Sequence, residues 1–104
     1  MDFAKKVIKF VKAFQMSITN MEVAKQLVRS AGSIGANYIE ANESLSKKDF
    51  LMRIKICRKE SKETAYWLKL VEVKEHKEEK ERALLITEAT ELMKIFGSIV
   101  EKAK

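Results

Sequence analysis

Residues 27–70 read LVRSAGSIGANYIEANESLSKKDFLMRIKICRKESKETAYWLKL. The first half has apolar residues at helical spacing around a middle rich in small residues, and the second half is a long, basic helical pattern. A polar break at 43–46 separates the two halves. Its last residue, Ser46, is a suitable helix N-cap, and Asp49 carries a carboxylate three positions later, as in a capping box. This stretch therefore predicts a helical hairpin and an all-α fold.

The composition of the chain fits one small helical domain. Its 104 residues are 46% hydrophobic and 35% charged, with no proline and three glycines, which favours helices joined by short polar turns. A chain of this length supports one modest core, so we expect a single domain spanning residues 1–104.

The apolar runs, the first six residues and the single cysteine favour a cytoplasmic protein without a membrane segment. No apolar run approaches the ~20 residues that a membrane span needs. Residues 1–6 alternate charged and apolar side chains, unlike the apolar centre of a signal peptide. The sole cysteine, Cys57, cannot form an internal disulfide, which fits a reducing compartment.

Apolar residues that recur every three or four positions predict four helices. These are expected near residues 2–15, 20–42, 46–74 and 79–101, with Thr19 or Asn20 capping the second. The first helix carries an apolar stripe at Phe3, Val7, Phe10 and Phe14. The third carries the seam of a left-handed bundle at Phe50, Ile54, Cys57, Ser61, Thr64, Leu68 and Val71. The fourth presents a core face at Leu85, Ala89, Leu92, Phe96 and Ile99.

The middle of the second helix contains two glycines, Gly32 and Gly35. Each costs roughly 1 kcal/mol relative to alanine inside a helix, so we expect another backbone to approach closely there. The alternative is a break into two short helices. Arg29, Ser33, Asn37 and Glu40 form a polar line on one side of this helix. That line is expected to hydrogen-bond to a neighbouring helix or subunit, with a ligand or nucleic-acid site as the alternative.

The third helix is apolar over more of its circumference than one bundle core uses. Ile56, Trp67 and Leu70 lie beside the seam and widen the apolar arc to about 160°. Glu60 and Glu63 share that side. A tryptophan beside two glutamates suits a subunit interface, so the surplus apolar surface predicts self-association.

A second surface of the third helix is strongly basic. Lysines recur every seven residues, and residues 46–74 carry nine Lys or Arg against four Asp or Glu, which is +5 of the total net charge of +6. This row is either a solvated face or a stripe that contacts phosphates of RNA or DNA. The candidate nucleic-acid-binding residues are Lys48, Lys55, Arg58, Lys59, Lys62 and Lys69.

No residue pattern in the chain points to catalysis, a cofactor or a metal ion. His76 is the only histidine, which excludes a diiron bundle with paired Glu-x-x-His motifs. Cys57 lies on the core seam and is expected to be a buried structural thiol. Residues 32–35 lack the Lys-Ser/Thr ending of a phosphate loop. We therefore expect a protein that is not an enzyme, with no catalytic, cofactor-binding or metal site.

The middle of the chain resembles a known family of four-helix-bundle proteins. The matching segments are residues 29–41 (RSAGSIGANYIEA), 46–50 (SKKDF) and 59–70 (KESKETAYWLKL). The family is named for proteins encoded in intervening sequences of bacterial 23S rRNA genes. Some relatives have Asn-Ile-Ala-Glu-Gly where this chain has residues 37–41, so the chain looks like the branch labelled only four helix bundle protein.

The resemblance implies an antiparallel up-down-up-down bundle that assembles as a homopentameric ring. It also implies a relation to the accessory protein of diversity-generating retroelements, a basic pentamer that binds nucleic acid and the reverse transcriptase; this role transfers only by analogy. The family brings no catalytic residues. The residues that we assign to structural or subunit-interface duty are Arg29, Ser33, Asn37, Glu40, Glu60, Glu63 and Trp67.

Two hypotheses for the function follow. The first is a non-enzymatic, homo-oligomeric helical scaffold that binds RNA or DNA through its basic faces. The second is a protein-interaction adaptor with no nucleic-acid role, in which Tyr66, Trp67 and Val73 dock a partner protein. The sequence identifies neither the partner nor the pathway.

Overall fold

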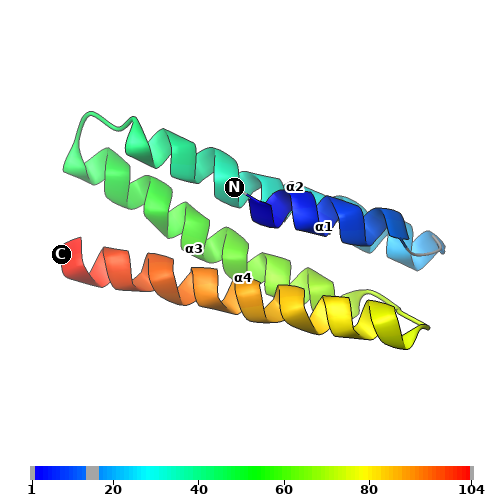
Figure 1. Ribbon diagram of the computed structural model, residues 1–104. Coiled ribbons are helices and arrows are strands. Elements are labelled where there is room, and N and C mark those ends of the chain that lie inside the picture. The colour runs from blue at the N-terminus through cyan, green and yellow to red at the C-terminus, as the bar shows by residue number, and fades with distance from the viewer. Residues whose placement is uncertain (1, 14–16, 104) are drawn as a thin grey trace.

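The computed structural model describes residues 2–13 and 17–103, and these fold into four α-helices without a strand. The helices are α1 (Asp2–Ala13), α2 (Ile18–Asn42), α3 (Lys47–Leu70) and α4 (His76–Ala103), shown in Figure 1. The prediction of an all-α, four-helix fold is confirmed. The end of the first predicted helix, with Phe14, lies outside the described residues.

The helices lie side by side in an elongated body of 46 × 19 × 19 Å. The α2–α3 and α3–α4 contacts are the most extensive, and α1 packs between α2 and α4. The α2–α3 and α3–α4 connections are at opposite ends of the body (Figure 1). With 12 residues, α1 covers only part of the length of α2, which has 25.

The start of α3 follows the capping pattern in the sequence. Ser46 adopts an extended backbone, and its Oγ accepts a hydrogen bond from the Asp49 backbone N–H at 3.1 Å. The cap of α2 differs from the prediction, because Ser17 is the cap and its Oγ accepts from the Asn20 N–H at 3.0 Å. The prediction of Thr19 or Asn20 as the cap was wrong.

Asn20 instead joins the start of α2 to the end of α3. Its side chain is buried, its Nδ2 donates to the Glu72 carbonyl at 2.9 Å, and its Oδ1 accepts from the Glu72 N–H at 2.9 Å. Because these bonds hold the Glu72 backbone outside a helix, α3 ends at Leu70 rather than near residue 74. Arg82 also donates to the Val71 carbonyl, and α4 begins at His76 rather than near residue 79.

The seam of α3 is the centre of the core. Ile54, Cys57, Ser61, Thr64 and Leu68 are each 0% exposed. The two buried hydroxyls are satisfied, because Ser61 Oγ donates to the Cys57 carbonyl at 2.8 Å and Thr64 Oγ1 lies 2.7 Å from the Glu60 carbonyl oxygen. The core residues of the other helices form one cluster with this seam; they are Phe3, Val7, Phe10, Val23, Leu27, Ala31, Ile34, Ala41, Leu85, Ala89, Phe96 and Val100.

The glycine-containing middle of α2 is a continuous helix, so the alternative of two short helices is wrong. The close contact with α3 is made by Ser30, which is fully buried and has its Oγ 2.8 Å from Thr64 Oγ1. Gly32 is exposed, and a Cβ added there would meet no atom within 4 Å. The predicted close approach of another backbone is therefore absent at Gly32 within this chain.

Candidate interaction surfaces

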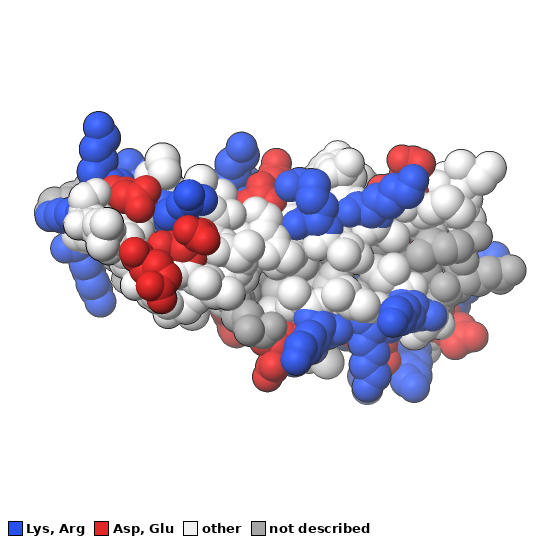
Figure 2. Space-filling model, turned by 90° about the horizontal axis from the view of Figure 1, so that it is seen from above, with Lys and Arg blue, Asp and Glu red and all other residues white. Residues whose placement is uncertain are grey.

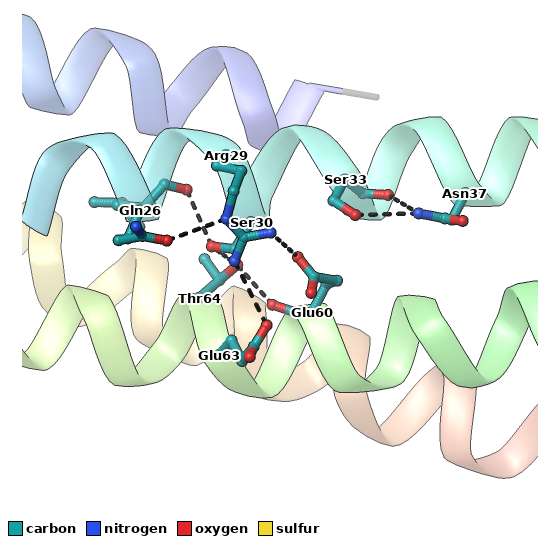
Figure 3. Close-up of polar contacts among 9 residues, drawn as sticks. Gln26, Arg29, Ser30, Ser33, Asn37, Glu60, Glu63 and Thr64 are labelled. Atoms are coloured by element: carbon teal, nitrogen blue, oxygen red, sulfur yellow. Dashed lines mark hydrogen bonds and ion pairs between the residues drawn. The ribbon is translucent and has the colours of Figure 1, made fainter.

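At Arg29, the polar line of α2 meets α3 through a charged cluster (Figure 3). Arg29 lies between two glutamates of α3: its Nη1 is 3.1 Å from Glu60 Oε2 and its Nη2 is 3.7 Å from Glu63 Oε2. The Glu60 side chain is only 8% exposed, whereas that of Glu63 is 39% exposed. The sequence placed Arg29 on a polar line of the second helix, and it placed Glu60 and Glu63 beside the apolar seam of the third. The structure brings these residues together.

The environment of Glu60 favours its protonated form. Burial raises the pKa of Glu60 above its ordinary value, and the hydrogen bond to Glu63 and the charge of that carboxylate raise it further. The Arg29 guanidinium opposes this rise by its charge and its hydrogen bond. The cluster is an ionic link between two helices in which one guanidinium, itself 52% exposed, is shared by the buried Glu60 and the half-exposed Glu63.

The remainder of the polar line also bonds within the chain. Asn37 Nδ2 donates to the Ser33 carbonyl at 2.9 Å and to Ser33 Oγ at 3.1 Å (Figure 3). Asn37 Oδ1 accepts from Arg53 Nη1 of α3 at 3.0 Å. Glu40 is exposed. Sequence reasoning missed Arg53, although its position seven residues before Glu60 places it on the same edge of α3.

The outward side of α3 carries an apolar stripe, formed by Met52, Ile56, Trp67 and Leu70. Met52 is 47% and Leu70 42% exposed, and Ile56 and Trp67 are partly buried. Tyr66, 55% exposed, lies edge-on to the Trp67 ring at 5.1 Å between centroids. Within the described residues, buried Trp67 Nε1 has no hydrogen-bond partner, and buried Glu63 Oε2 has only its 3.7 Å ion pair with Arg29. Such orphaned groups are uncommon in folded proteins.

The basic row of α3, formed by Lys48, Lys55, Lys59, Lys62 and Lys69, borders this stripe. All five side chains are exposed. Arg58, which the sequence grouped with them, is partly buried, and its Cδ is 3.6 Å from the place where a Cβ on Gly97 of α4 would lie. Among residues 2–13 and 17–103, none of these six cations forms an ion pair.

A family model described as 23S rRNA-intervening sequence protein matches residues 1–98. The chain belongs to this family. It is also 31% identical to a protein of unknown function from the S23 ribosomal protein family of Bacteroides thetaiotaomicron, whose crystal structure it matches with a TM-score of 0.78 over 95% of this chain and 92% of that one. No curated protein matches.

The family membership confirms the resemblance based on residues 29–41, 46–50 and 59–70. The structure brings residues of two motif segments together, because Arg29 of the first segment pairs with Glu60 and Glu63 of the third. The motif therefore marks the α2–α3 packing and the adjoining outer surface of α3.

Cys57 has the environment of a structural thiol. It is 0% exposed, its Sγ donates to the Ile34 carbonyl at 3.5 Å, and burial raises its pKa to about 11. At neutral pH it is therefore a thiol rather than a nucleophilic thiolate. In the described part of the chain, no three His, Cys, Asp or Glu side chains come together as metal ligands, and no helix is long and apolar enough to cross a membrane.

Proposed function

We propose that this member of the 23S rRNA-intervening sequence protein family is a non-enzymatic cytoplasmic scaffold that binds RNA or DNA. In this proposal the chain is an antiparallel up-down-up-down bundle, and five copies form a ring. The observation that carries the nucleic-acid part is the basic row of α3, whose five exposed lysines have no acidic partner among the described residues.

The length of the basic row suits a phosphate backbone. Lys48 and Lys69 are 21 residues apart, which is about 32 Å along a helix at 1.5 Å per residue. Lysine side chains contact phosphates as point charges without reading the bases, so the expected binding is independent of sequence. Several copies in one assembly would present several rows, and simultaneous contacts raise the overall affinity.

The assembly part of the proposal is supported by the apolar stripe of α3. Trp67 and Ile56 are only partly buried by their own chain, and Met52 and Leu70 are more than 40% exposed. Burial of such a stripe against another copy removes apolar surface from water, and it would bring a possible hydrogen-bond partner to Trp67 Nε1, which has none among the described residues.

The nucleic-acid part is tested by filter binding of labelled RNA and single-stranded DNA at 50 and 200 mM salt. We expect retention at low salt and a steep loss at high salt, because each neutralised phosphate releases counterions. The double variant Lys55→Gln/Lys62→Gln should lower the slope of log K against log salt by roughly 0.7–0.9 per lost contact. The control Lys94→Gln/Lys102→Gln removes the same charge from exposed positions of α4 and should leave the slope near wild type.

Two outcomes would contradict this part of the proposal. The first is no retention of either nucleic acid at low salt. The second is an equal effect of the α3 and α4 variants, which would mean that net charge alone is responsible.

The second candidate is a protein-interaction adaptor, favoured by the exposed Tyr66 ring against Trp67. Aromatic side chains are enriched at the energetic centres of protein interfaces. The discriminating experiment is affinity capture from the native host after nuclease treatment. Recovery of one protein by the wild type but not by Tyr66→Ala, together with no nucleic-acid binding, would replace the scaffold proposal with the adaptor.

A further inference from the structure

We infer that the basic row of α3 binds a single strand of RNA or DNA, and that one base of this strand stacks on the ring of Tyr66. The inference rests on the proposed function and deepens it, because it names single strands rather than duplexes as the preferred ligand. In such a contact the base lies flat on the phenol ring, and the phosphates on either side of it reach lysine side chains. RNA and DNA are equivalent for this contact, since every base has a π-face.

Tyr66 lies within the basic row rather than beside it. It comes four residues after Lys62 and three residues before Lys69, so the three side chains project from the same face of α3. At 1.5 Å per residue, Lys62 lies about 6 Å before Tyr66 along the helix axis and Lys69 about 4.5 Å after it. A strand that runs along the row can therefore place phosphates at both lysines and a base over the ring.

The ring of Tyr66 is accessible from solvent. The residue is 55% exposed. Within the described residues, the only aromatic ring that it contacts is that of Trp67, at 5.1 Å between centroids and 65° between planes. An edge contact of this kind is not a parallel stack, so Trp67 supports one side of the Tyr66 ring and leaves the remainder open for a base.

The charges around Tyr66 favour a polyanion. Lys62 and Lys69 are both exposed, and neither forms an ion pair within residues 2–13 and 17–103. The carboxylate of Glu63, three residues before Tyr66, is already paired with Arg29 Nη2 at 3.7 Å. The two lysine charges are therefore available for phosphates, whose neutralisation releases counterions.

A stacked base distinguishes a single strand from a duplex. In a duplex each base is stacked between its neighbours, and a side chain reaches its flat face only by wedging between base steps and unstacking them. A single strand presents its bases to an exposed ring without that cost. Tyr66 therefore adds affinity for single strands, whereas the lysines of the row contact the phosphates of single strands and duplexes alike.

The described part of α1 and α2 offers a poorer site for a strand. Figure 2 looks down on this face and shows acidic side chains among the basic ones, around an uncharged band. Lys6 is paired with Glu88 at 2.9 Å, and Lys25 is paired with Glu22 at 3.6 Å. Tyr38 of α2 is 39% exposed, but the positions three and four residues away from it on either side carry no charge.

The test compares ligands that differ in the bases they expose. They are an oligothymidylate of about 20 nucleotides, longer than the site of one chain, an oligouridylate of the same length, an abasic DNA strand of the same length, and a DNA duplex. The abasic strand keeps the phosphates and lacks the bases. Fluorescence anisotropy of each labelled ligand at 50 mM salt measures its affinity.

The variants separate the ring of Tyr66 from its hydroxyl. Tyr66→Leu removes the ring at an exposed position, and Tyr66→Phe keeps the ring without the hydroxyl. The matched control is Tyr38→Leu, which removes the other tyrosine of the chain. All proteins are full-length, and circular dichroism verifies that each is helical. Sedimentation velocity verifies the same assembly state as the wild type, because the loss of copies would also lower the affinity.

We expect the wild type to bind both oligonucleotides at least about fivefold more tightly than the abasic strand. Tyr66→Leu should lose this preference, with an affinity for the oligonucleotides that is lower by the same factor and with unchanged affinities for the abasic strand and the duplex. Tyr66→Phe and Tyr38→Leu should behave as the wild type, because each keeps the ring of residue 66.

A second measurement uses the unaltered protein and holds even if Tyr66→Leu does not fold. UV irradiation of the wild type with an oligouridylate that carries 5-iodouracil cross-links bases to the aromatic rings on which they stack. Mass spectrometry of the peptides should locate the cross-link at Tyr66. Cross-links confined to other residues would overturn the stacking contact.

The possible failures are distinguishable. If the wild type binds none of the ligands, the proposed nucleic-acid function itself is overturned. If the wild type binds them and Tyr66→Leu binds the oligonucleotides equally well, the function stands and the stacking contact is overturned. An equal loss for all ligands in Tyr66→Leu, or a Tyr66→Phe protein as weak as Tyr66→Leu, also overturns stacking, since neither result depends on a base meeting the ring.

Discussion

Ser30 and Gly32 of α2 differ in burial and in contacts, because Ser30 faces the inside of the α2–α3 hairpin and Gly32 faces the outside. Ser30 is 0% exposed and lies 2.8 Å from Thr64 Oγ1, so its small size and its hydroxyl are both explained by α3. Gly32 is exposed and touches nothing that would exclude a side chain. Ser30 thus has a partner within the chain, whereas Gly32 lowers helix stability without one. The outer surfaces are therefore where contacts with other molecules are expected.

The largest expected effect is on the free energy of unfolding, and it distinguishes replacement of Leu68 from replacement of Leu70 in α3. Leu68 is 0% and Leu70 is 42% exposed. Leu68→Ala should lower the free energy of unfolding by about 2–5 kcal/mol, because it removes a buried side chain and leaves a cavity. Leu70→Ala should change it by less than about 1 kcal/mol and act mainly on self-association. Urea unfolding at one fixed protein concentration measures both variants. A similar loss of unfolding free energy in the two would contradict the proposed difference between the inner and outer faces of α3.

The next effect concerns the buried hydroxyl pair. Thr64→Val keeps the shape of the side chain and should lower the free energy of unfolding by about 1–2 kcal/mol, because the hydrogen bonds of Thr64 Oγ1 are lost. A double-mutant cycle with Ser30→Ala isolates the contact between the two side chains, with an expected coupling of about 0.5–1.5 kcal/mol. A coupling near zero would mean that the pair does not help to hold α2 against α3.

At the outer surface of α2, a substitution is expected to increase the free energy of unfolding rather than lower it. Gly32→Ala should raise the free energy of unfolding of the monomer by about 0.5–1 kcal/mol, because alanine is the better helix former and its methyl group meets open space. The reciprocal control is Ala36→Gly at an exposed position of the same helix, with an expected loss of similar size. Thermal melts of both variants provide the comparison. A destabilised Gly32→Ala monomer would show a contact at Gly32 within the chain.

The stability of the folded chain is expected to depend on pH through the charged cluster. Burial raises the pKa of Glu60 in the folded chain above 4.5. The contribution of this group to stability is therefore fully present below pH 4.5 and is lost as the pH rises through the folded pKa. Glu60→Gln should flatten the dependence of the urea midpoint on pH above 4.5 relative to the wild type, whereas Glu43→Gln, at an exposed position, should not. Parallel profiles for Glu60→Gln and wild type would contradict this account.

The sequence predicted the parts of the fold that depend on local pattern. The spacing of Ile54, Cys57 and Leu68 marked the buried seam, and Ser46 with Asp49 marked the start of α3. It did not predict the end of α3, because Val71 and Val73 continue the apolar pattern past it. That end is held by Asn20, which lies 52 residues before Glu72, and no local pattern reveals so distant a hydrogen bond.

The candidate surfaces could be predicted only in part, because they too depend on contacts between residues that are distant in the sequence. The heptad repeat of lysines placed the basic row on one side of α3. However, it did not show that Arg58 turns toward Gly97 of α4. Similarly, the polar line of α2 and the two glutamates of α3 were visible separately in the sequence. However, the pairing of Arg29 with Glu60 and of Asn37 with Arg53 depends on the register between the helices.

The central claim is that the outer apolar stripe of α3 is covered by other copies of the chain. Static light scattering of the full chain at micromolar concentration tests it most directly, with Trp67→Ala measured beside it. The account predicts a wild-type mass of about 60 kDa for five copies of a 12.0 kDa chain, and a lower mass for Trp67→Ala because a buried aromatic anchor is lost. A wild-type protein with the mass of one chain at micromolar concentration would contradict the account.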